Sequence, residues 1–423
     1  MHQNKRINGL TLYMKILQLC KKFPYPLKDG EAIAVTYLSR ALHELGCEVS
    51  LLAMNTSKHY VDTDNLPRQF NHYKKIFTSF VDNRVKPFDA FVNLFSEESY
   101  NISRFVTDGY KKQLINLLER EDYDVIQLET LYLAPYIPII RQYSTAKIVM
   151  RSHNIEHEIW ERLSVNATNL LKKWYLTYLT KKLKRFELAQ LSQYDAMLAI
   201  TQRDLTFSQK LGYNKPAIVV PIGLDISYYT ADNSCYRSPL KLSFIGSLDW
   251  QPNIEGLTWF LDNVWDDITK ALPEVEFHIA GRNTPDWLKN LKKKNVFIHG
   301  EVPDAQEFIN KFPLMIVPLL SGGGMRAKIL EGMALGKVIL STSIGLEGIN
   351  AEHEEHVLVA DTPAEFVASL IEYQELDKLL AIGQRAQVFT AKNYDNYEIA
   401  KKVLTFYRHL CGMKVEKRIA VNA

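Results

Sequence analysis

The segment SGGGMRAKILEG, residues 321–332, combines residue types that bind a phosphate group. Its three consecutive glycines are Gly322, Gly323 and Gly324. Glycine disfavours a helix by about 1 kcal/mol relative to alanine, but it lets an anion approach the backbone closely. The apolar residues that follow have helical spacing, so we expect a helix to begin here with its free N–H groups facing the loop. The segment therefore predicts a phosphate-binding glycine loop at a helix N-terminus.

Two cations and a carboxylate follow the glycines, and their spacing indicates a further ligand group. We expect Arg326 and Lys328 in the first helical turn, where cations oppose the helix dipole unless an anion neutralises them. Lys328 and Glu331 are three residues apart and share a helix face, which places an ammonium group beside an acceptor for hydroxyl groups. A sugar nucleotide has both phosphates and hydroxyls. This segment alone leaves an alternative open, a glycine loop beside a solvated Lys–Glu pair.

A second segment with metal-ligand residue types is RSHNIEHEIW, residues 151–160. His153, Glu156 and His157 fit the His-x-x-Glu-His pattern of inverted zinc proteases. That pattern binds zinc only within a helix, where both histidines share one face. His153 directly follows an expected strand, which places it in a loop or at a helix start, and the sequence identifies no third acidic ligand. We therefore expect no metal site here.

The elements that must position these residues alternate between apolar runs and amphipathic segments, which is typical of parallel sheets covered by helices. In the first half we expect a helix at 32–45 and strands at 14–20, 48–54, 124–129, 146–152, 195–201 and 217–225. In the second half we expect helices at 250–272 and 325–335 and strands at 241–248, 277–281, 295–300, 314–320 and 337–342.

This order of elements predicts an α/β protein with two Rossmann-like domains whose parallel sheets face an interdomain cleft. We expect the N-terminal domain at residues 14–225 and the C-terminal domain at 241–395, joined by a linker at 226–240. A C-terminal helix at 396–412 is expected to pack back on the N-terminal domain.

The composition is that of an ordinary globular enzyme. The 423 residues are 47% hydrophobic and 23% charged, and the formal net charge of +3 is too small to indicate a nucleic-acid partner. The four cysteines lack metal-ligand spacing and indicate reduced thiols. The N-terminus has no signal-peptide core, and no apolar stretch is long enough to span a membrane. We therefore expect a cytoplasmic protein without a metal or another cofactor.

Several segments are similar to those of a known family. They are FIGSLDWQPNIEGLTWF, FHIAG, NVFIHGEVPD, PLLSGGGMRAKILEGMALGKVILST and HVLVAD in the second half, and VVPIGLD and KDGEAIAVTYLSRALHELGCEV in the first. Together they resemble the retaining glycosyltransferases of the family 4 group, the glycosyl transferases group 1, which have the GT-B fold. The resemblance covers most of the chain, although each motif alone would be weak.

The resemblance implies that the C-terminal domain binds a nucleoside diphosphate sugar and that the N-terminal domain binds an acceptor. It further implies transfer with retention at the anomeric carbon, usually without a metal bound through an Asp-x-Asp motif. By the same resemblance, Glu331 binds the ribose, the backbone from Gly300 to Val302 holds the base, and Gly30 lies beside the diphosphate. His153 matches a histidine near the donor sugar, and a structural histidine is the alternative.

The sequence departs from the family pattern at two places. Gly323 stands where many members have an acidic residue near the donor sugar. Many members also have a cation shortly after Gly246, the glycine that ends the first strand of the C-terminal domain, whereas this chain has residues 247–249 without one. We still expect Gly246 to bind the substrate. The charge that stabilises a diphosphate leaving group must then come from Arg326 and Lys328.

Three further features allow two interpretations each. Glu129 ends an expected strand, and its carboxylate could orient an acceptor or cap the next helix. Gly223 and Asp225 are expected to shape the domain hinge rather than to do chemistry. Residues 170–190 interleave six cations with aromatic residues, which suits peripheral contact with an anionic membrane, and a solvated surface helix is the alternative.

The leading hypothesis is a retaining glycosyltransferase that uses a nucleotide-sugar donor and a glycan or lipid-linked acceptor. We expect it in the cytoplasm or peripherally at the inner face of the membrane, in the synthesis of a cell-surface polysaccharide or glycoconjugate. One alternative is a nucleotide-sugar-binding partner subunit without transferase activity, suggested by Gly323 and the missing cation. Another is a nucleotide-sugar epimerase on the same fold, which would convert the donor without an acceptor.

Overall fold

The computed structural model describes residues 13–27, 30–84, 93, 96, 99–165, 169–237, 239–322 and 324–413. These residues form two compact units. Unit 1 contains the described residues up to Ala199, Asp204–Val220 and those from Ala400 onward. Unit 2 contains Ile200–Arg203 and Pro221–Ile399.

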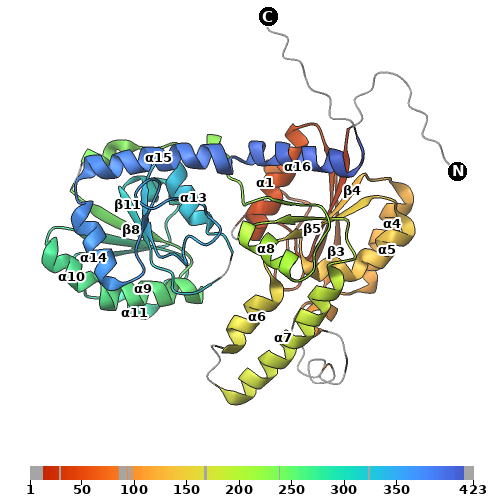
Figure 1. Cartoon of the computed structure of the whole chain (residues 1–423), viewed down its shortest axis with the longest axis horizontal. Helices are drawn as coiled ribbons and strands as arrows, with labels where there is room; N and C mark the ends of the chain where they lie inside the picture. The colour runs from red at the N-terminus through yellow and green to blue at the C-terminus, as the bar shows by residue number, and fades with distance from the viewer. Residues whose placement is uncertain are drawn as a thin grey trace, which may run out of the picture. The chain divides into compact units, whose positions relative to one another are not determined.

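Unit 1 is built on a parallel sheet with the strand order β3-β2-β1-β4-β5-β6-β7 (Figure 1). Its strands are β1 (Lys15–Cys20), β2 (Glu48–Thr56), β3 (Lys75–Val81), β4 (Val125–Leu128), β5 (Lys147–Ser152), β6 (Ala196–Ala199) and β7 (Ala217–Val219). Strands β1, β4 and β6 are buried along nearly their whole length, which explains why they are mainly apolar.

Helices cover both faces of this sheet and supply its core. They are α1 (Gly30–Glu44), α3 (Tyr100–Ser103), α4 (Asp108–Arg120), α5 (Ile137–Tyr143), α6 (Glu156–Val165), α7 (Leu170–Gln190), α8 (Gln202–Lys210) and α16 (Asn396–Leu410). Short 3₁₀ turns lie at Arg68–Phe70 and Leu131–Tyr136. Among the helices of the described residues, none is long and apolar enough to cross a membrane.

The C-terminal helix α16 carries a buried apolar stripe at helical spacing. The buried residues of this stripe are Ala400, Val403, Leu404 and Tyr407. The phenol of Tyr407 also donates a hydrogen bond to the side-chain oxygen of Gln127 on β4. The described residues 400–413 therefore belong to unit 1, although they follow the whole of unit 2 in the sequence.

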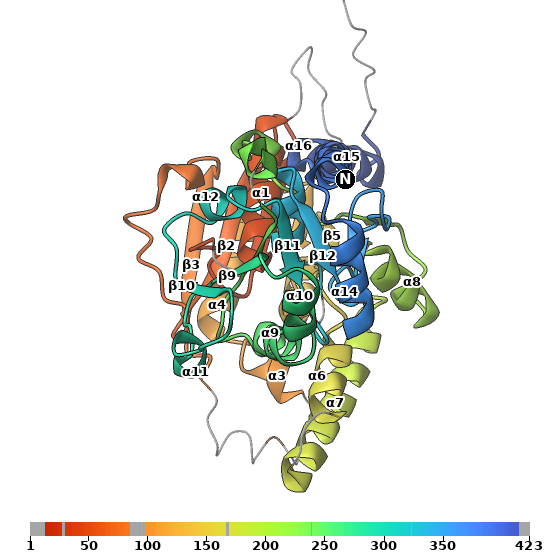
Figure 2. The same cartoon turned by 90° about the vertical axis from the view of Figure 1, so that its left-hand side faces the viewer.

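Unit 2 has a parallel sheet with the strand order β10-β9-β8-β11-β12-β13 (Figure 2). Its strands are β8 (Lys241–Ile245), β9 (Glu276–Ala280), β10 (Val296–Gly300), β11 (Leu314–Val317), β12 (Val338–Ser341) and β13 (Leu358–Val359). Its helices are α9 (Gln251–Asn263), α10 (Trp265–Ala271), α11 (Asp286–Lys289), α12 (Ala305–Asn310), α13 (Ala327–Ala334), α14 (Pro363–Glu372) and α15 (Leu376–Tyr394). Two parallel sheets in α/β units confirm the predicted fold class.

Three details differ from the sequence-based expectation. The helix expected at 250–272 is broken at Val264, whose φ of −123° interrupts the helical backbone between α9 and α10. The expected linker contains 3₁₀ turns at Ile226–Tyr228 and Asn233–Arg237. Tyr236 of the second turn is buried in the core of unit 2. Its phenol donates a 2.8 Å hydrogen bond to the carbonyl oxygen of Gly336 and lies 3.2 Å from that of Pro313.

Helix α9 lies unusually close to the chain that follows β11. A Cβ atom added at Gly256 would stand 2.2 Å from the carbonyl oxygen of Pro318, a distance that real Cβ atoms do not reach. Glycine is unfavourable inside a helix by about 1 kcal/mol relative to alanine. Its presence here is explained by the space that the backbone at Pro318 occupies.

We predict that Gly256→Ala destabilises the protein, although alanine is the better helix former. Separating α9 from the chain at Pro318 should lower the free energy of unfolding by about 2 kcal/mol or more, which urea unfolding would detect. The control is Gly109→Ala in α4, where the nearest atom to a new Cβ is the Ser79 hydroxyl at 3.3 Å. An unchanged stability in Gly256→Ala would contradict the close approach.

Candidate functional site

The glycine loop lies between β11 and α13 in unit 2. Gly322 and Gly324 have φ angles of 109° and 79°, in the left-handed region where glycine is the favoured residue. Gly323 lies outside the described residues. A side chain on Gly322 would also stand 3.1 Å from the guanidinium group of Arg326. The two described glycines are therefore required by backbone conformation, and Gly322 also by the space left for Arg326.

Arg326 precedes α13 and does not lie in its first turn, which corrects the expected helix start. Its φ and ψ of −94° and 95° are extended, so helical spacing does not determine the direction of its side chain. The guanidinium group donates to the carbonyl oxygen of Gly324 and lies 5.8 Å from the ring of Trp250, the residue before α9. Arg326 is 5% exposed. It thus contacts the N-terminal end of a second helix.

Lys328 contacts the same end of α9. Its ammonium group donates a 2.8 Å hydrogen bond to the side-chain oxygen of Asn253 and lies 4.6 Å from the ring centre of Phe244. The amide of Asn253 in turn donates to the carbonyl oxygen of Ser247. A Cβ at Gly246 would stand 3.3 Å from the lysine nitrogen. Lys328 therefore places its ammonium group beside Gly246, although residues 247–249 that follow Gly246 contain no cation.

The charge state of Lys328 is sensitive to its surroundings. Burial, and secondarily the positive charge of Arg326, lowers the pKa of Lys328 from 10.5 to about 7. A phosphate group next to the amine would favour the charged form and raise this pKa again. The first turn of α9, the glycine loop and two cations thus form a surface suited to an anion.

Glu331 lies one turn further along α13. Its carboxylate accepts a 3.1 Å hydrogen bond from the phenol of Tyr229. Burial raises the pKa of Glu331, and the bond from Tyr229 opposes this shift. Tyr229 follows the first 3₁₀ turn of the expected linker. The linker therefore supplies the residue that holds Glu331, the predicted ribose-binding residue, in place.

The strands β8, β9 and β10 end in glycines at one edge of the unit 2 sheet. Gly246 donates its N–H to Ala280 at 3.2 Å, and Gly281 donates to Gly300 at 2.7 Å. Gly300 has a φ of 69°, with open space around the position of a Cβ. Val302 packs against the apolar cluster of α12 next to it. The described residues predicted for donor binding in this unit follow strand ends at one sheet edge or lie on α13.

Glu129 lies in unit 1 and is fully buried just after β4. Its carboxylate lies 3.4 Å from Arg151 and 3.0 Å from the Nε2 atom of His153. Burial raises the pKa of Glu129, but Arg151 and His153 outweigh burial and hold it below its usual range. An ionised carboxylate at hydrogen-bond distance fixes the orientation of the imidazole ring.

A hydrogen-bond network surrounds this buried carboxylate. The side-chain amides of Gln18 on β1 and Gln127 on β4 both donate to it. Arg151 also donates to the carbonyl oxygen of Ala34 in α1. Because Glu129 is 0% exposed and held by these neighbours, it does not cap the helix that follows. The network instead joins β1, β4, β5 and α1 around His153.

The two histidines of the HNIEH segment have different partners. His153 pairs with Glu129, whereas His157 places its Nδ1 atom 2.7 Å from Glu187 of α7. Glu187 also accepts the backbone N–H groups of Glu156 and His157, which begin α6. Helix α6 starts at Glu156, so His153 lies before it and the one-turn spacing of a zinc motif does not form. Among the described residues no cluster of His, Cys, Asp and Glu could hold a metal ion.

The remaining predicted residues lie at chain turns. Gly30 begins α1, and the next residue, Glu31, lies 3.4 Å from the amine of Lys21. Gly223 packs closely, because a Cβ there would stand 2.9 Å from Asn396. Asp225 accepts a hydrogen bond from the hydroxyl of Ser227. These contacts of Gly223 and Asp225 shape the backbone around the start of unit 2.

Sequence reasoning did not identify Asn253, Tyr229 or Arg151. The first two contact Lys328 and Glu331 in unit 2, and Arg151 contacts Glu129 in unit 1. Asn253 and Tyr229 contact α13 across 75 and 102 residues of sequence. The position of Asn253, in the first turn of a helix that follows Gly246, is one sequence signal that could have identified it. Arg151 lies in an apolar strand, where a charged residue indicates a buried partner.

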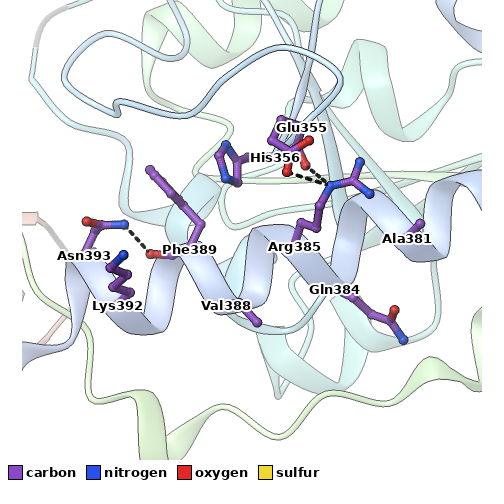
Figure 3. Close-up of a pocket in the computed structure, with 9 residues that line it drawn as sticks. All are labelled: Glu355, His356, Ala381, Gln384, Arg385, Val388, Phe389, Lys392 and Asn393. Carbon is purple, nitrogen blue, oxygen red and sulfur yellow. Dashed lines mark hydrogen bonds and ion pairs between the residues drawn. The ribbon is translucent and has the colours of Figure 1, made fainter.

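A depression elsewhere in unit 2 contains none of the predicted site residues (Figure 3). It lies along α15 and includes Arg385, Phe389 and Lys392. The guanidinium of Arg385 donates to the carbonyl oxygens of Glu354 and Glu355, as Figure 3 shows for Glu355. Because this arginine stabilises the turn before β13, the depression is not assigned to the candidate site.

Comparison with known proteins relates the glycine loop, Lys328 and Glu331 of unit 2 to a protein family. Residues 239–375 match the model of the family described as glycosyl transferases group 1. This range contains every residue of the glycine loop, α13 and the first turn of α9. A Klebsiella pneumoniae protein described as an uncharacterized 44.6 kDa protein in the cps region is 23% identical over 403 residues. That alignment covers 92% of this chain and 98% of the relative.

Solved structures with similar folds cover nearly the whole chain. Sucrose-phosphate synthase from Thermosynechococcus elongatus has a TM-score of 0.69 at 13% identity, covering 94% of this chain and 99% of its own. Anabaena HepE in complex with UDP has a TM-score of 0.64 at 14% identity, with 93% and 99% covered. TarM has a TM-score of 0.65 at 10% identity, with 94% and 99% covered. At these identities the likeness shows the fold, which is GT-B.

The depressed pKa of Lys328 predicts that stability rises with pH above about 7. Between the folded-state pKa of about 7 and the ordinary value of 10.5, the unfolded chain binds a proton that the folded chain lacks. The free energy of unfolding should therefore rise by at most about 1.4 kcal/mol per pH unit in this window. Lys328→Met should remove this slope in urea unfolding, and the exposed Lys292→Met should keep it. Equal slopes in wild type and Lys328→Met would contradict the burial of the amine.

Proposed function

The chain belongs to the group 1 glycosyltransferases, and from this premise we propose the reaction, donor and acceptor class of this enzyme. The protein transfers a sugar, with retention of the anomeric configuration, from a nucleoside diphosphate sugar to a glycan or lipid-linked acceptor. The observation that carries the proposal is the position of Lys328, whose ammonium group lies beside Gly246 and on the first turn of α9.

The donor proposal rests on unit 2 and on the bound states of proteins with similar folds. Anabaena HepE was solved with UDP and with UDP-glucose, and an Escherichia coli trehalose-6-phosphate protein with UDP-2-fluoro glucose. UDP is therefore the first nucleotide to test. Glu331 would accept the ribose hydroxyls, because a carboxylate can accept from two hydroxyls at once and Tyr229 holds it in place. The base would lie against the backbone from Gly300 to Val302.

Breaking the sugar–diphosphate bond develops negative charge on the leaving oxygen. Lys328 and Arg326 would stabilise this charge, together with the N–H groups of the glycine loop. Both side chains are already held, the first by Asn253 and the second against Trp250, so little reorganisation is needed when charge develops. This arrangement would stabilise the leaving group with protein charges alone.

His153 is proposed to hydrogen-bond a hydroxyl of the donor sugar. Its Nε2 atom lies 3.0 Å from the buried carboxylate of Glu129, which leaves the Nδ1 side of the ring for a substrate. We assign Glu129 a positioning role rather than direct contact with the acceptor, because its carboxylate is fully buried. Gly30, at the start of α1 in the same unit, is proposed to approach the diphosphate through its backbone.

The biological setting is proposed to be cell-surface polysaccharide or glycoconjugate synthesis. The support is the Klebsiella pneumoniae relative, which is described as lying in the cps region. We infer a cytoplasmic enzyme, peripheral to the inner face of the membrane. All four cysteines are free thiols, as expected for a reducing compartment.

We predict that Lys328→Ala and Glu331→Ala each weaken nucleotide binding without unfolding the protein. The first removes a charge from the phosphate and the second removes an acceptor from the ribose, so each should raise the Kd by about tenfold or more. A thermal-shift panel of UDP, GDP, ADP, dTDP and their sugars identifies the base, and titration calorimetry then gives the Kd.

The matched controls are Lys311→Ala and Glu307→Ala. These residues form a solvated Lys–Glu pair on α12, 2.8 Å apart, in the same unit. They test the alternative that Lys328 and Glu331 are merely such a pair. Equal affinity in all four variants would contradict the site assignment. Binding without transfer to any acceptor would favour an inactive partner subunit, and donor conversion without acceptor an epimerase.

We predict that His153→Asn lowers the rate of sugar transfer by about tenfold to a hundredfold, because it removes a hydrogen bond that is proposed to act in the transition state. The affinity for UDP should stay unchanged, since UDP lacks the donor sugar that His153 is proposed to contact. The comparison variant is His157→Asn, which removes the contact with Glu187 and should lower the Tm instead. A His153→Asn enzyme with normal turnover would show that His153 is structural.

A further inference from the structure

Helices α6 and α7 form a hairpin that extends away from the sheet of unit 1 (Figure 1), and its far end exposes apolar side chains. The exposed apolar residues there are Leu163, Val165, Leu170, Leu171 and Trp174. We call these five residues, with Lys172 and Lys173, the hairpin tip. We propose that the hairpin tip docks the protein on an anionic lipid bilayer.

The apolar exposure at the tip is concentrated and high. Leu170 is 82% exposed, Leu171 is 79% exposed and Trp174 is 62% exposed. Single exposed apolar side chains are ordinary on a protein surface, but a contiguous group marks a contact surface. Trp174 also stacks on Tyr178 with ring centres 6.1 Å apart, which places two aromatic rings side by side at the tip end of α7. Tryptophan and tyrosine favour the headgroup level of a bilayer, where one end is apolar and the other wet.

The charge of α7 favours an anionic partner. Its sequence contains one carboxylate, Glu187, and six cations, of which Lys172 and Lys173 belong to the hairpin tip. Glu187 is buried because it caps the N-terminus of α6, so it does not offset the cations at the surface. Lys172 and Lys173 are exposed between Leu171 and Trp174. Apolar insertion together with lysines near the surface supplies the two signals that stable peripheral binding needs.

The structure limits the contact to the tip and narrows the surface expected at residues 170–190. Leu179 and Leu183 are buried in unit 1, and Lys182 donates to the carbonyl oxygens of Asn93 and Ser96. The helix between Leu170 and Leu179 is about 13 Å long at 1.5 Å per residue. That length lets the exposed end of α7 reach the depth of about 5–10 Å at which the apolar faces of interfacial helices are buried. Contact of the bilayer with the tip alone therefore fits the structure better than contact with α7 along its full length.

The test is flotation of the full-length protein with vesicles of phosphatidylcholine, alone or mixed with phosphatidylglycerol. We expect binding to the anionic vesicles, weakened by salt, and little binding to phosphatidylcholine alone. The double variant Leu170→Ser/Leu171→Ser should weaken partitioning by at least about tenfold, since it removes two apolar side chains. Lys172→Gln/Lys173→Gln should weaken it only for anionic vesicles, by about fivefold per lysine.

Trp174→Phe tests insertion directly, because it keeps an apolar ring and removes one indole. Wild type should show a vesicle-induced blue shift of tryptophan emission that Trp174→Phe lacks, while both proteins bind. The control variants are Tyr60→Ser, which removes an aromatic ring 68% exposed elsewhere in unit 1, and the exposed Lys112→Gln of α4. Neither should change partitioning.

Three results would overturn the proposal. They are the absence of binding to anionic vesicles, binding that the tip and control variants share equally, or dimerisation through the tip. Light scattering detects dimerisation as a mass that falls to one chain in Leu170→Ser/Leu171→Ser. Because the tip side chains are exposed, the variants should keep the wild-type Tm. The vesicle test needs no sugar, so its outcome is separate from that of the glycosyl-transfer assay.

Discussion

The candidate site of unit 2 depends on how closely α9 approaches the chain that follows β11. Gly256 permits that approach, because any side chain there would overlap the carbonyl oxygen of Pro318. As a consequence, the first turn of α9 reaches the residues after the glycine loop, so Trp250 contacts Arg326 and Asn253 contacts Lys328. With α9 further away, both cations would extend into water and lose their fixed positions. A glycine that weakens the helix is thus retained for the geometry of the site.

The pKa of Glu129 in unit 1 and the pKa of Glu331 in unit 2 shift in opposite directions. In unit 1, burial raises the pKa of Glu129, but Arg151, His153 and the amide of Gln18 outweigh burial and hold it below its usual range. In unit 2, burial lowers the pKa of Lys328 and raises that of Glu331, so both shift toward their neutral forms. Titratable groups shifted in this way typically occur at functional sites. The negative charge of a diphosphate would favour the protonated form of Lys328. The hydroxyl groups of a ribose would donate hydrogen bonds to Glu331.

The sequence predicted the features that depend on local pattern. The glycine loop follows from the demand for positive φ angles, and the placement of Lys328 and Glu331 about one turn apart on α13 follows from their spacing. Contacts across long sequence separations could not be predicted in this way. Tyr229 meets Glu331 only because the linker folds onto unit 2, and Glu129 is buried only because β1, β5 and α1 enclose it. The contact of Arg326 with Trp250 likewise joins residues far apart in the sequence, so no local pattern predicts it.

The hairpin of α6 and α7 shows why its tip can remain exposed. An isolated helix of two or three turns is unstable in water, so the free end of α7 must gain its stability from the rest of the helix. Glu187 supplies the anchor, because its carboxylate binds both the N-terminal N–H groups of α6 and the ring of His157. Leu179 and Leu183 fix the same half of α7 in unit 1. The anchored half therefore keeps the tip helical and prevents its leucines and tryptophan from folding back onto the core, which is the condition for presenting them to a bilayer.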